Sequence, residues 1–231
     1  MSIILVPTSH VAEESIIKIK EVIEKVKPDC VCVELDENRY QALKSKQSSS
    51  FKSLGPSTWV IFTLLKKLQE KVGEIVNVMP GSDMLTAVEF SKEKNIPVYF
   101  IDQPIQTTLY NFQKLSFSEK LKLIKYALLA SFSIYTGMGK NKQKIDLTKV
   151  PEEELIDEVM AEFQKSFPRL YKILVEDRNI YMANQLKELS KTYKNIVAVV
   201  GAGHKKGIRE LLADIKVHYI IKYTYDNNFN P

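Results

Sequence analysis

The sequence predicts an α/β fold in which a central, mostly parallel β-sheet is flanked by helices. Two stretches support this prediction: residues 3–10 and residues 196–204 each run through apolar residues, many of them β-branched, and end at a histidine. A helical pattern of apolar residues follows each stretch. Strands buried on both faces of a parallel sheet have this continuous apolar character. The length of 231 residues fits a single domain.

The N-terminal residues predict a strand–helix–strand unit. We expect a strand at residues 2–6, a helix at residues 16–26 and a second strand at residues 29–35. A unit of this length joins two parallel strands by a right-handed crossover. The two cysteines of the chain, Cys30 and Cys32, are spaced by two on the second strand and point to the same face. They are therefore expected to be reduced core residues rather than a disulfide.

Helices and one polar loop are predicted between the second and third strands. In chain order they are a helix that opens at Asp36, a serine-containing loop at residues 45–58, an amphipathic helix at residues 59–78 and a helix from Gly81 to about residue 90 with Ser82 as its N-cap. The third strand is expected at residues 96–101, and it delivers Asp102 at its end.

Residues 105–193 carry no strand pattern and are expected to form a helical insertion between the third and fourth strands. Apolar residues recur at helical spacing in three parts of it, the last of them unbroken: residues 121–135, 152–163 and 170–193. The fourth strand leads to His204, a helix follows through Leu212, and a last strand is expected at residues 216–223.

The charge and hydropathy of the chain exclude several classes of partner. The formal net charge of +5 is spread over faces of mixed sign, which is typical of a solvated surface rather than of nucleic-acid binding. The longest apolar windows, residues 59–65 and 126–135, fall short of the roughly 20 residues of a membrane span. No signal peptide is expected, because the N-terminus begins directly with a strand. We expect a cytoplasmic protein, or a membrane-associated one if the chain is part of a longer protein.

Ionisable residues gather at the predicted carboxyl ends of the strands, where open α/β sheets bind ligands. They are His10, Glu34, Asp102 and His204, joined by Asp83 at a helix start. Imidazole and carboxylate groups bind Mn, Co or Zn, so His10, His204 and Glu34 are the predicted metal ligands. Glu34 is alternatively the base that activates a metal-bound water, and Asp102 alternatively orients an imidazole.

Each of these residues also has a structural interpretation. A histidine at a strand end often makes an ordinary hydrogen bond, and a carboxylate at a helix start is often a cap. Two of the three histidines occupy equivalent positions in the sequence, and this coincidence favours one shared site. His218 lies within the last predicted strand and is expected to be structural.

Two further features lie near the predicted site. Gly201 and Gly203 precede His204 without the third glycine of a dinucleotide fingerprint or the Lys-Ser/Thr of a P-loop, so nucleotide binding is not expected. Together with Asp102, these glycines are expected to line a cofactor, because glycine lets the backbone approach a ligand closely. Arg178 lies in a polar run of a predicted helix, either on an exposed face or reaching the site to bind a carboxylate or an oxyanion.

A set of short motifs extends in order over nearly the whole chain. The motifs are Pro7-Thr8-Ser9-His10, residues 28–36 with Arg39, Gly81-Ser82-Asp83-Met84, Ile101-Asp102-Gln103-Pro104-Ile105, Asp177-Arg178-Asn179 with Met182, and residues 199–204 with Gly207-Ile208. As a set they resemble the TraB/PrgY/GumN family in its archaeal form, which is related to the Tiki proteins.

This resemblance implies a fold like that of the erythromycin-esterase and ChaN-like proteins, with two Gly-x-x-His motifs around one cleft. Tiki members are metal-dependent peptidases, and PrgY-type members act in pheromone shutdown by reducing the activity of a peptide pheromone. By position, His10 and His204 match the motif histidines, Glu34 matches the strand-end acid, and Arg178 matches the helical arginine.

The chain departs from the family pattern at three positions. Pro7 stands where glycine is usual and fixes φ in that turn. Asp83 stands where glutamate is common and has a shorter reach, and Gln103 stands where arginine is common. Archaeal relatives often carry membrane helices after this domain, and none follow here, so we expect either a soluble form or a shortened chain.

We therefore expect a metal-dependent hydrolase, a peptidase that acts on short peptides through a metal-activated water. Glu34 would be the base, Arg178 would stabilise the developing charge, and Asp83 is the third catalytic candidate. The alternative is a non-catalytic module of the same fold that binds a peptide or haem, which the departure at Pro7 favours. A membrane-facing or partner-facing surface at residues 126–135, and a homodimer formed through the helical insertion, are further alternatives.

Overall fold

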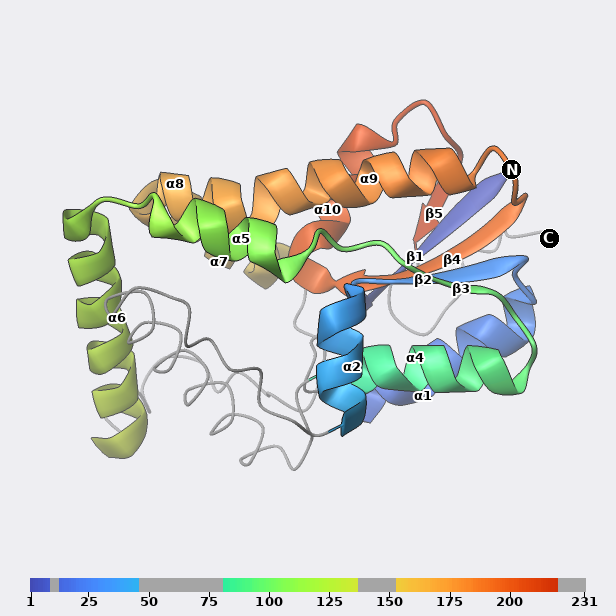
Figure 1. Cartoon of the computed structure of the whole chain (residues 1–231), viewed down its shortest axis with the longest axis horizontal. Helices are drawn as coiled ribbons and strands as arrows, with labels where there is room; N and C mark the ends of the chain where they lie inside the picture. Colours follow the sequence, from blue (N-terminus) through green and yellow to red (C-terminus); the bar gives the residue numbers. More distant parts are fainter. Residues whose placement is uncertain (9–12, 46–80, 137–152, 220–231) are drawn as a thin grey trace.

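A computed structural model describes residues 1–8, 13–45, 81–136 and 153–219. Its centre is a five-stranded sheet, parallel throughout, in the order β3-β2-β4-β1-β5. The strands are β1 (Ser2–Thr8), β2 (Cys30–Val33), β3 (Val98–Phe100), β4 (Asn195–Gly201) and β5 (Val217–Tyr219). Helices cover both faces of the sheet (Figure 1). The predicted α/β class is confirmed.

The last long strand, β4, lies between β1 and β2 at the centre of the sheet. Thr8 of β1 pairs with Gly201, and Val33 of β2 pairs with Val199. The carboxyl ends of β1, β2 and β4 therefore reach the same edge of the sheet. This register places Glu34, which follows β2, beside the turn that leads from β4 to His204.

Successive residues of each strand point to opposite faces, so the sheet contributes to two cores. Ile4 and Val6 face the layer formed by α1 (Glu13–Val26), α2 (Glu37–Ser45) and α4 (Ser82–Glu93). Ile3 and Leu5 face the layer formed by α9 (Asp177–Leu189) and α10 (Ala202–Leu211). Figure 1 shows these layers below and above the sheet. Coverage of both faces explains the unbroken apolar runs of β1 and β4.

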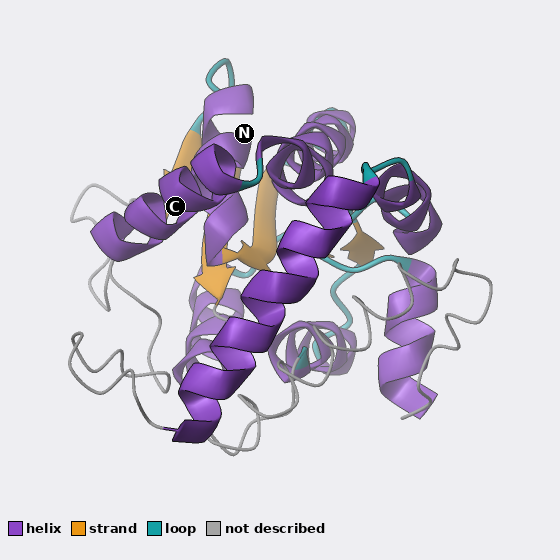
Figure 2. Ribbon diagram, turned by 90° about the vertical axis from the view of Figure 1, so that its left-hand side faces the viewer, coloured by secondary structure: helices purple, strands orange, loops and turns teal. Residues whose placement is uncertain are grey.

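The chain between β3 and β4 contains no strand among its described residues. It forms α5 (Ile105–Gln113), α6 (Phe117–Thr136), α7 (Glu153–Ser166), α8 (Pro168–Tyr171), the π-helical turn η1 (Lys172–Glu176) and α9. Phe112, Leu115, Leu170 and Ile173 form a separate small core here. Figure 2, seen from the left of Figure 1, shows α6 as the long helix in front of the sheet.

Two sequence predictions are wrong, one about the start of α4 and one about the helix that leads into β4. A third element, α5, was missed by the sequence prediction. Ser82 does not cap α4, because the N-cap position is taken by Gly81 in a left-handed conformation (φ 83°). The helix expected at residues 170–193 is interrupted by η1, where the Asp177 N–H donates to the carbonyl oxygen of Lys172, five residues earlier. The helix ends at Leu189, and a turn precedes β4.

Several predictions fall on residues outside the described ranges. These are the loop at residues 45–58, except for its first residue, the helix at residues 59–78, and residues 220–223 of the last strand. No helix among the described residues is long and apolar enough to cross a membrane.

The thiols of Cys30 and Cys32 are expected to be unreactive in the folded protein. Both are buried and neither forms a disulfide, as predicted. Burial raises the pKa of the Cys32 thiol well above its ordinary value, and contact with Cys30 adds to this shift. Because the thiolate is the reactive form, iodoacetamide at pH 8 should label neither cysteine in buffer and both in urea. Rapid labelling of the folded protein, measured by mass spectrometry, would contradict this expectation.

Candidate functional site

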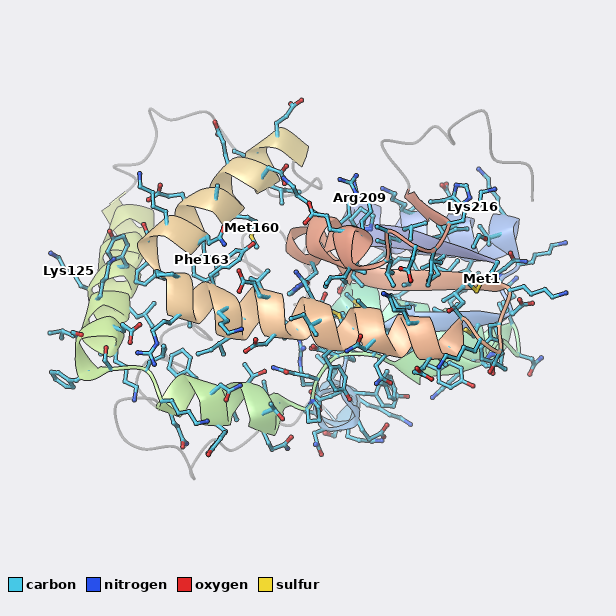
Figure 3. The ribbon with its side chains drawn as sticks, turned by 90° about the horizontal axis from the view of Figure 1, so that it is seen from above. Met1, Lys125, Met160, Phe163, Arg209 and Lys216 are labelled. Atoms are coloured by element: carbon cyan, nitrogen blue, oxygen red, sulfur yellow. The ribbon has the colours of Figure 1, made fainter. Side chains whose placement is uncertain are left out.

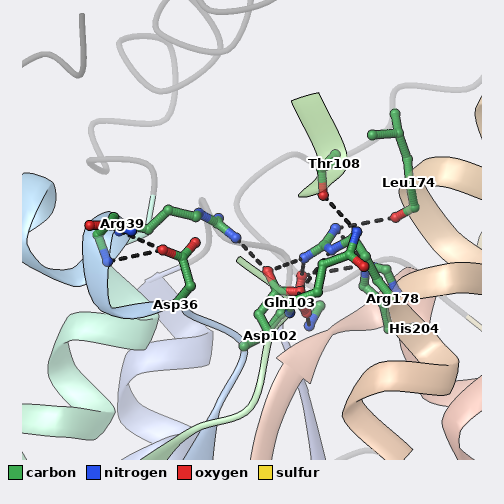
Figure 4. Close-up of polar contacts among 11 residues, drawn as sticks. Asp36, Arg39, Asp102, Gln103, Thr108, Leu174, Arg178 and His204 are labelled. Atoms are coloured by element: carbon green, nitrogen blue, oxygen red, sulfur yellow. Dashed lines mark hydrogen bonds and ion pairs between the residues drawn. The ribbon is translucent and has the colours of Figure 1, made fainter. Parts of the chain in front are cut away.

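The side chain of Arg178, in the first turn of α9, is the centre of a polar cluster at the carboxyl edge of the sheet (Figure 4). Its Nε donates to Asp102 Oδ1 at 2.9 Å, and its Nη2 donates to Asp102 Oδ2 at 2.8 Å and to Glu34 Oε1. Its Nη1 donates to the Leu174 carbonyl oxygen at 3.2 Å and lies 3.1 Å from His204 Nε2. These contacts use all five N–H groups of the guanidinium.

The two carboxylates come from neighbouring strands. Glu34 follows β2 and Asp102 follows β3, and these strands pair with Val33 opposite Phe100. Glu34 also accepts the backbone N–H of Gly201 at 2.6 Å through Oε2. The side chains of Glu34 and Asp102 are only 3% and 2% exposed. Two buried negative charges are thus held within hydrogen-bond distance of one guanidinium.

The charge of Arg178 is maintained by these neighbours. Burial alone would lower the pKa of the guanidinium, but the carboxylates of Glu34 and Asp102 raise it above its ordinary value. A second cation supports Asp102, because Arg39 Nη1 donates to Asp102 Oδ2 at 2.7 Å. Two arginines therefore compensate two buried carboxylates.

His204 lies in the first turn of α10 with a defined ring orientation. Its Nδ1 lies 2.7 Å from Asn179 Oδ1. Because an amide oxygen can only accept, we assign the ring proton to Nδ1. The Nε2 atom then carries the lone pair, accepts from Arg178 Nη1 and lies 3.4 Å from Glu34 Oε1. With this assignment, the lone pair of His204 Nε2 faces a carboxylate and a guanidinium.

Asn179 is a site residue whose role the sequence did not predict. It follows Arg178 on α9, and its side chain packs against Gly207 of α10. A Cβ at Gly207 would lie 2.2 Å from Asn179 Nδ2, so the absence of a side chain there lets the two helices approach. Gly207 is three residues after His204, on the same helix face. This spacing was the available sequence signal.

The structure brings four of the predicted site residues into one cluster: Glu34, Asp102, Arg178 and His204. Gly201 joins them through its backbone N–H. Gly203 instead lies against Met160 of α7, whose side chain is labelled in Figure 3. Asp83 is buried in the first turn of α4, in the helix layer opposite to α9. His10 lies outside the described residues.

The described part of the cluster does not fit a metal ion. Among the described residues, no group of three or more His, Cys, Asp and Glu side chains could hold one. The guanidinium of Arg178 contacts Glu34, Asp102 and His204 Nε2, the same donors that a divalent cation would need. A cation there would have to displace Arg178. The ligand set of His10, His204 and Glu34 stays a prediction, because it depends on His10.

Comparisons with known proteins identify the family. The model of the TraB/PrgY/gumN family matches residues 1–218. The chain is 33% identical to the uncharacterized protein MJ1365 of Methanocaldococcus jannaschii, over 93% of this chain and 54% of that protein. It is 25% identical to the TraB domain-containing proteins of Mus musculus and Homo sapiens, over 89% of this chain and 61% of each. The chain thus spans little more than half the length of these relatives. It belongs to the TraB/PrgY/gumN family.

Proposed function

We propose that this chain is a hydrolase that cleaves short peptides, with His204 as the base that accepts a proton from water. The observation that supports the proposal is the hydrogen bond from His204 Nδ1 to Asn179, which leaves Nε2 as the proton acceptor. Glu34 Oε1, at 3.4 Å from Nε2, would stabilise the imidazolium that forms. Peptides are the substrate class that the family resemblance implies.

Arg178 would act on the substrate carbonyl. In the absence of substrate its Nη1 donates to His204 Nε2 as well as to Leu174. A substrate carbonyl oxygen that takes the donor facing His204 would free Nε2 to accept a hydrogen bond from water. The same N–H would then stabilise negative charge as it develops on that oxygen. One displacement would therefore prepare both the base and the oxyanion donor.

The reaction would proceed by attack of the water oxygen on the carbonyl carbon while a proton moves to His204 Nε2. The imidazolium would return this proton to the amide nitrogen as the C–N bond breaks. A carboxylic acid product and an amine product account for all atoms. Glu34 and Asp102 would hold Arg178 in place throughout, through the contacts that they make with it in the resting site.

A peptide-binding module without turnover is the second candidate. It is favoured by the complete set of acceptors around Arg178, since every guanidinium N–H already has a partner without a ligand. Such a closed arrangement suits a structural ion cluster. The two candidates differ in one respect that can be measured: the hydrolase cleaves peptides and needs His204 to do so, whereas the binding module binds peptides without cleaving them.

The test is incubation of the whole chain with a library of short peptides in ¹⁸O-labelled water, with and without a chelator. We expect ¹⁸O in the new carboxylates, no loss with chelator, and a fall in kcat/KM of about 100-fold to 10,000-fold in His204→Ala. His218→Ala, which changes a histidine of the edge strand β5, is the matched control and should stay within a few-fold of wild type.

The other outcomes are equally informative. Peptide binding without ¹⁸O incorporation would favour the binding module. Activity that chelator removes and that Mn, Co or Zn restores would favour the metal-dependent route that the sequence predicted.

A further inference from the structure

We propose that Arg39 binds a carboxylate of the peptide substrate, close to the bond that is cleaved. This inference rests on the proposed peptide hydrolase and names the substrate class more narrowly. Arg39 is in the first turn of α2, outside the predicted catalytic set, and its guanidinium reaches the cluster at Asp102.

The position of Arg39 is fixed by an oxygen that it shares with Arg178. Asp102 Oδ2 accepts Arg39 Nη1 at 2.7 Å and Arg178 Nη2 at 2.8 Å. Figure 4 shows Asp102 between Arg39 on one side and Arg178 with His204 on the other. Two guanidinium groups that contact one oxygen are held side by side, and the buried carboxylate anchors both of them.

The two arginines differ in the donors that they have left. All five N–H groups of Arg178 have acceptors, and its side chain is 15% exposed. The guanidinium of Arg39 makes one hydrogen bond among the described residues, to Asp102, and its side chain is 38% exposed. A guanidinium can bind a carboxylate through two parallel N–H groups. Counting the described residues alone, Arg39 has donors left for this contact, and Arg178 does not.

A free acceptor lies on the residue that caps α2. Asp36 Oδ1 accepts the backbone N–H groups of Asn38 at 2.9 Å and Arg39 at 3.2 Å, which fixes the turn that carries Arg39. The residue is 6% exposed, yet its Oδ2 has no hydrogen-bond partner in the described structure. A buried carboxylate oxygen without a donor is costly, so a substrate N–H group that reached Asp36 Oδ2 would be bound favourably. A peptide offers both a carboxylate for Arg39 and an N–H for Asp36.

The spacing of the arginines limits where the carboxylate can be. In the proposed reaction the substrate carbonyl contacts Arg178, and Arg39 is its immediate neighbour across one carboxylate oxygen. Consecutive Cα atoms of a peptide lie about 3.8 Å apart, so neighbouring guanidinium groups can contact groups of neighbouring residues. The carboxylate is therefore either the C-terminus of the peptide, directly after the cleaved bond, or an acidic side chain of an adjacent residue.

The experiment compares matched peptides with a free C-terminus, an amidated C-terminus, and an amidated C-terminus with aspartate or asparagine beside the cleaved bond. KM and kcat are measured for wild type, Arg39→Gln and Arg39→Lys. Binding of each peptide to His204→Ala is measured by calorimetry, so recognition is observed without turnover. Arg169→Gln is the matched control. It changes an arginine that lies away from the cluster and pairs with Glu119 at 3.2 Å.

We expect wild type to prefer carboxylate peptides by about 10-fold to 100-fold in KM, as for a hydrogen bond to a charged group. Arg39→Gln should lose this preference, so that its ratio of KM values between the carboxylate peptides and the amidated asparagine peptide falls to about 1, whatever happens to its kcat. Arg39→Lys should retain part of the preference, and Arg169→Gln should retain all of it. A preference for free C-termini identifies the terminal carboxylate, and a preference for aspartate over asparagine identifies a side chain.

Equal KM values for all peptides in wild type, or a preference that survives in Arg39→Gln, would overturn the inference while leaving the hydrolase proposal intact. Selective binding of carboxylate peptides through Arg39 with no cleavage would uphold the role of Arg39 and reject the hydrolase. The two proposals therefore fail in different ways.

Discussion

Replacement of Arg178 by methionine is expected to destabilise the protein by about 3–5 kcal/mol, the usual cost of removing one partner of a buried ion pair. Methionine keeps much of the side-chain length but leaves Glu34 and Asp102 without their shared cation. Both carboxylates are almost fully buried, so water cannot solvate them in its place. Because Arg39 still contacts Asp102, the larger part of the cost should fall on Glu34. Urea unfolding gives the free-energy difference.

A rescue experiment separates this charge effect from loss of packing. Adding Glu34→Gln and Asp102→Asn to Arg178→Met replaces buried charges with neutral amides, and part of the lost stability should return. Arg169→Met is the control, because its side chain is 60% exposed and its ion pair with Glu119 lies at the surface. It should change stability by less than about 1 kcal/mol. A triple variant that is less stable than Arg178→Met would contradict the expectation that unpaired buried charges cause the loss of stability.

Glu34, Asp102 and His204 could be predicted from the sequence because each follows an apolar run that only a buried parallel strand explains. The carboxyl ends of such strands share one edge of the sheet, so the grouping follows from local patterns and one topological rule. The spacing of Cys30 and Cys32 by two placed them on the same face of a strand, and the apolar run around them placed that strand in the core. These predictions needed no knowledge of which strand pairs with which.

The strand order and the contacts of Arg178 could not be predicted. Placement of β4 between β1 and β2 depends on pairing across more than 160 residues, as in Cys30 opposite Ile196, and no local pattern encodes it. Arg178 lies in a helix whose period suits an exposed face equally well. Its inward position depends on how α9 docks on the sheet, with η1 immediately before it. The acceptors for its five N–H groups come from parts of the chain that only the tertiary fold brings together: Glu34, Asp102, Leu174 and His204.

Gly207→Ala is expected to disturb the ring orientation of His204 indirectly, through Asn179, which holds His204 Nδ1. The added Cβ would lie 2.2 Å from Asn179 Nδ2 and 3.0 Å from its Cγ, so the short, buried Asn179 side chain must move or the helices must separate. Overpacking of this kind costs about 1–3 kcal/mol, against a gain of about 1 kcal/mol in helix propensity. We also expect kcat/KM to fall by about tenfold or more, because small displacements of a catalytic group slow a reaction strongly.

Gly203→Ala provides the matched control on the same helix. Its Cβ would meet Met160 Cε and Sδ at 3.2 Å, and the end of a methionine side chain can shift to relieve this contact. Its stability should therefore stay within about 1 kcal/mol of wild type. Nitrogen-15 NMR of the histidine rings shows which ring nitrogen of His204 carries the proton. The ring proton of His204 should reside on Nδ1 in wild type and in Gly203→Ala, and it should lose this preference in Gly207→Ala. A Gly207→Ala protein that keeps the Nδ1 proton and full activity would mean that α9 and α10 can move apart without disturbing Asn179, and that the close approach of these helices serves packing alone.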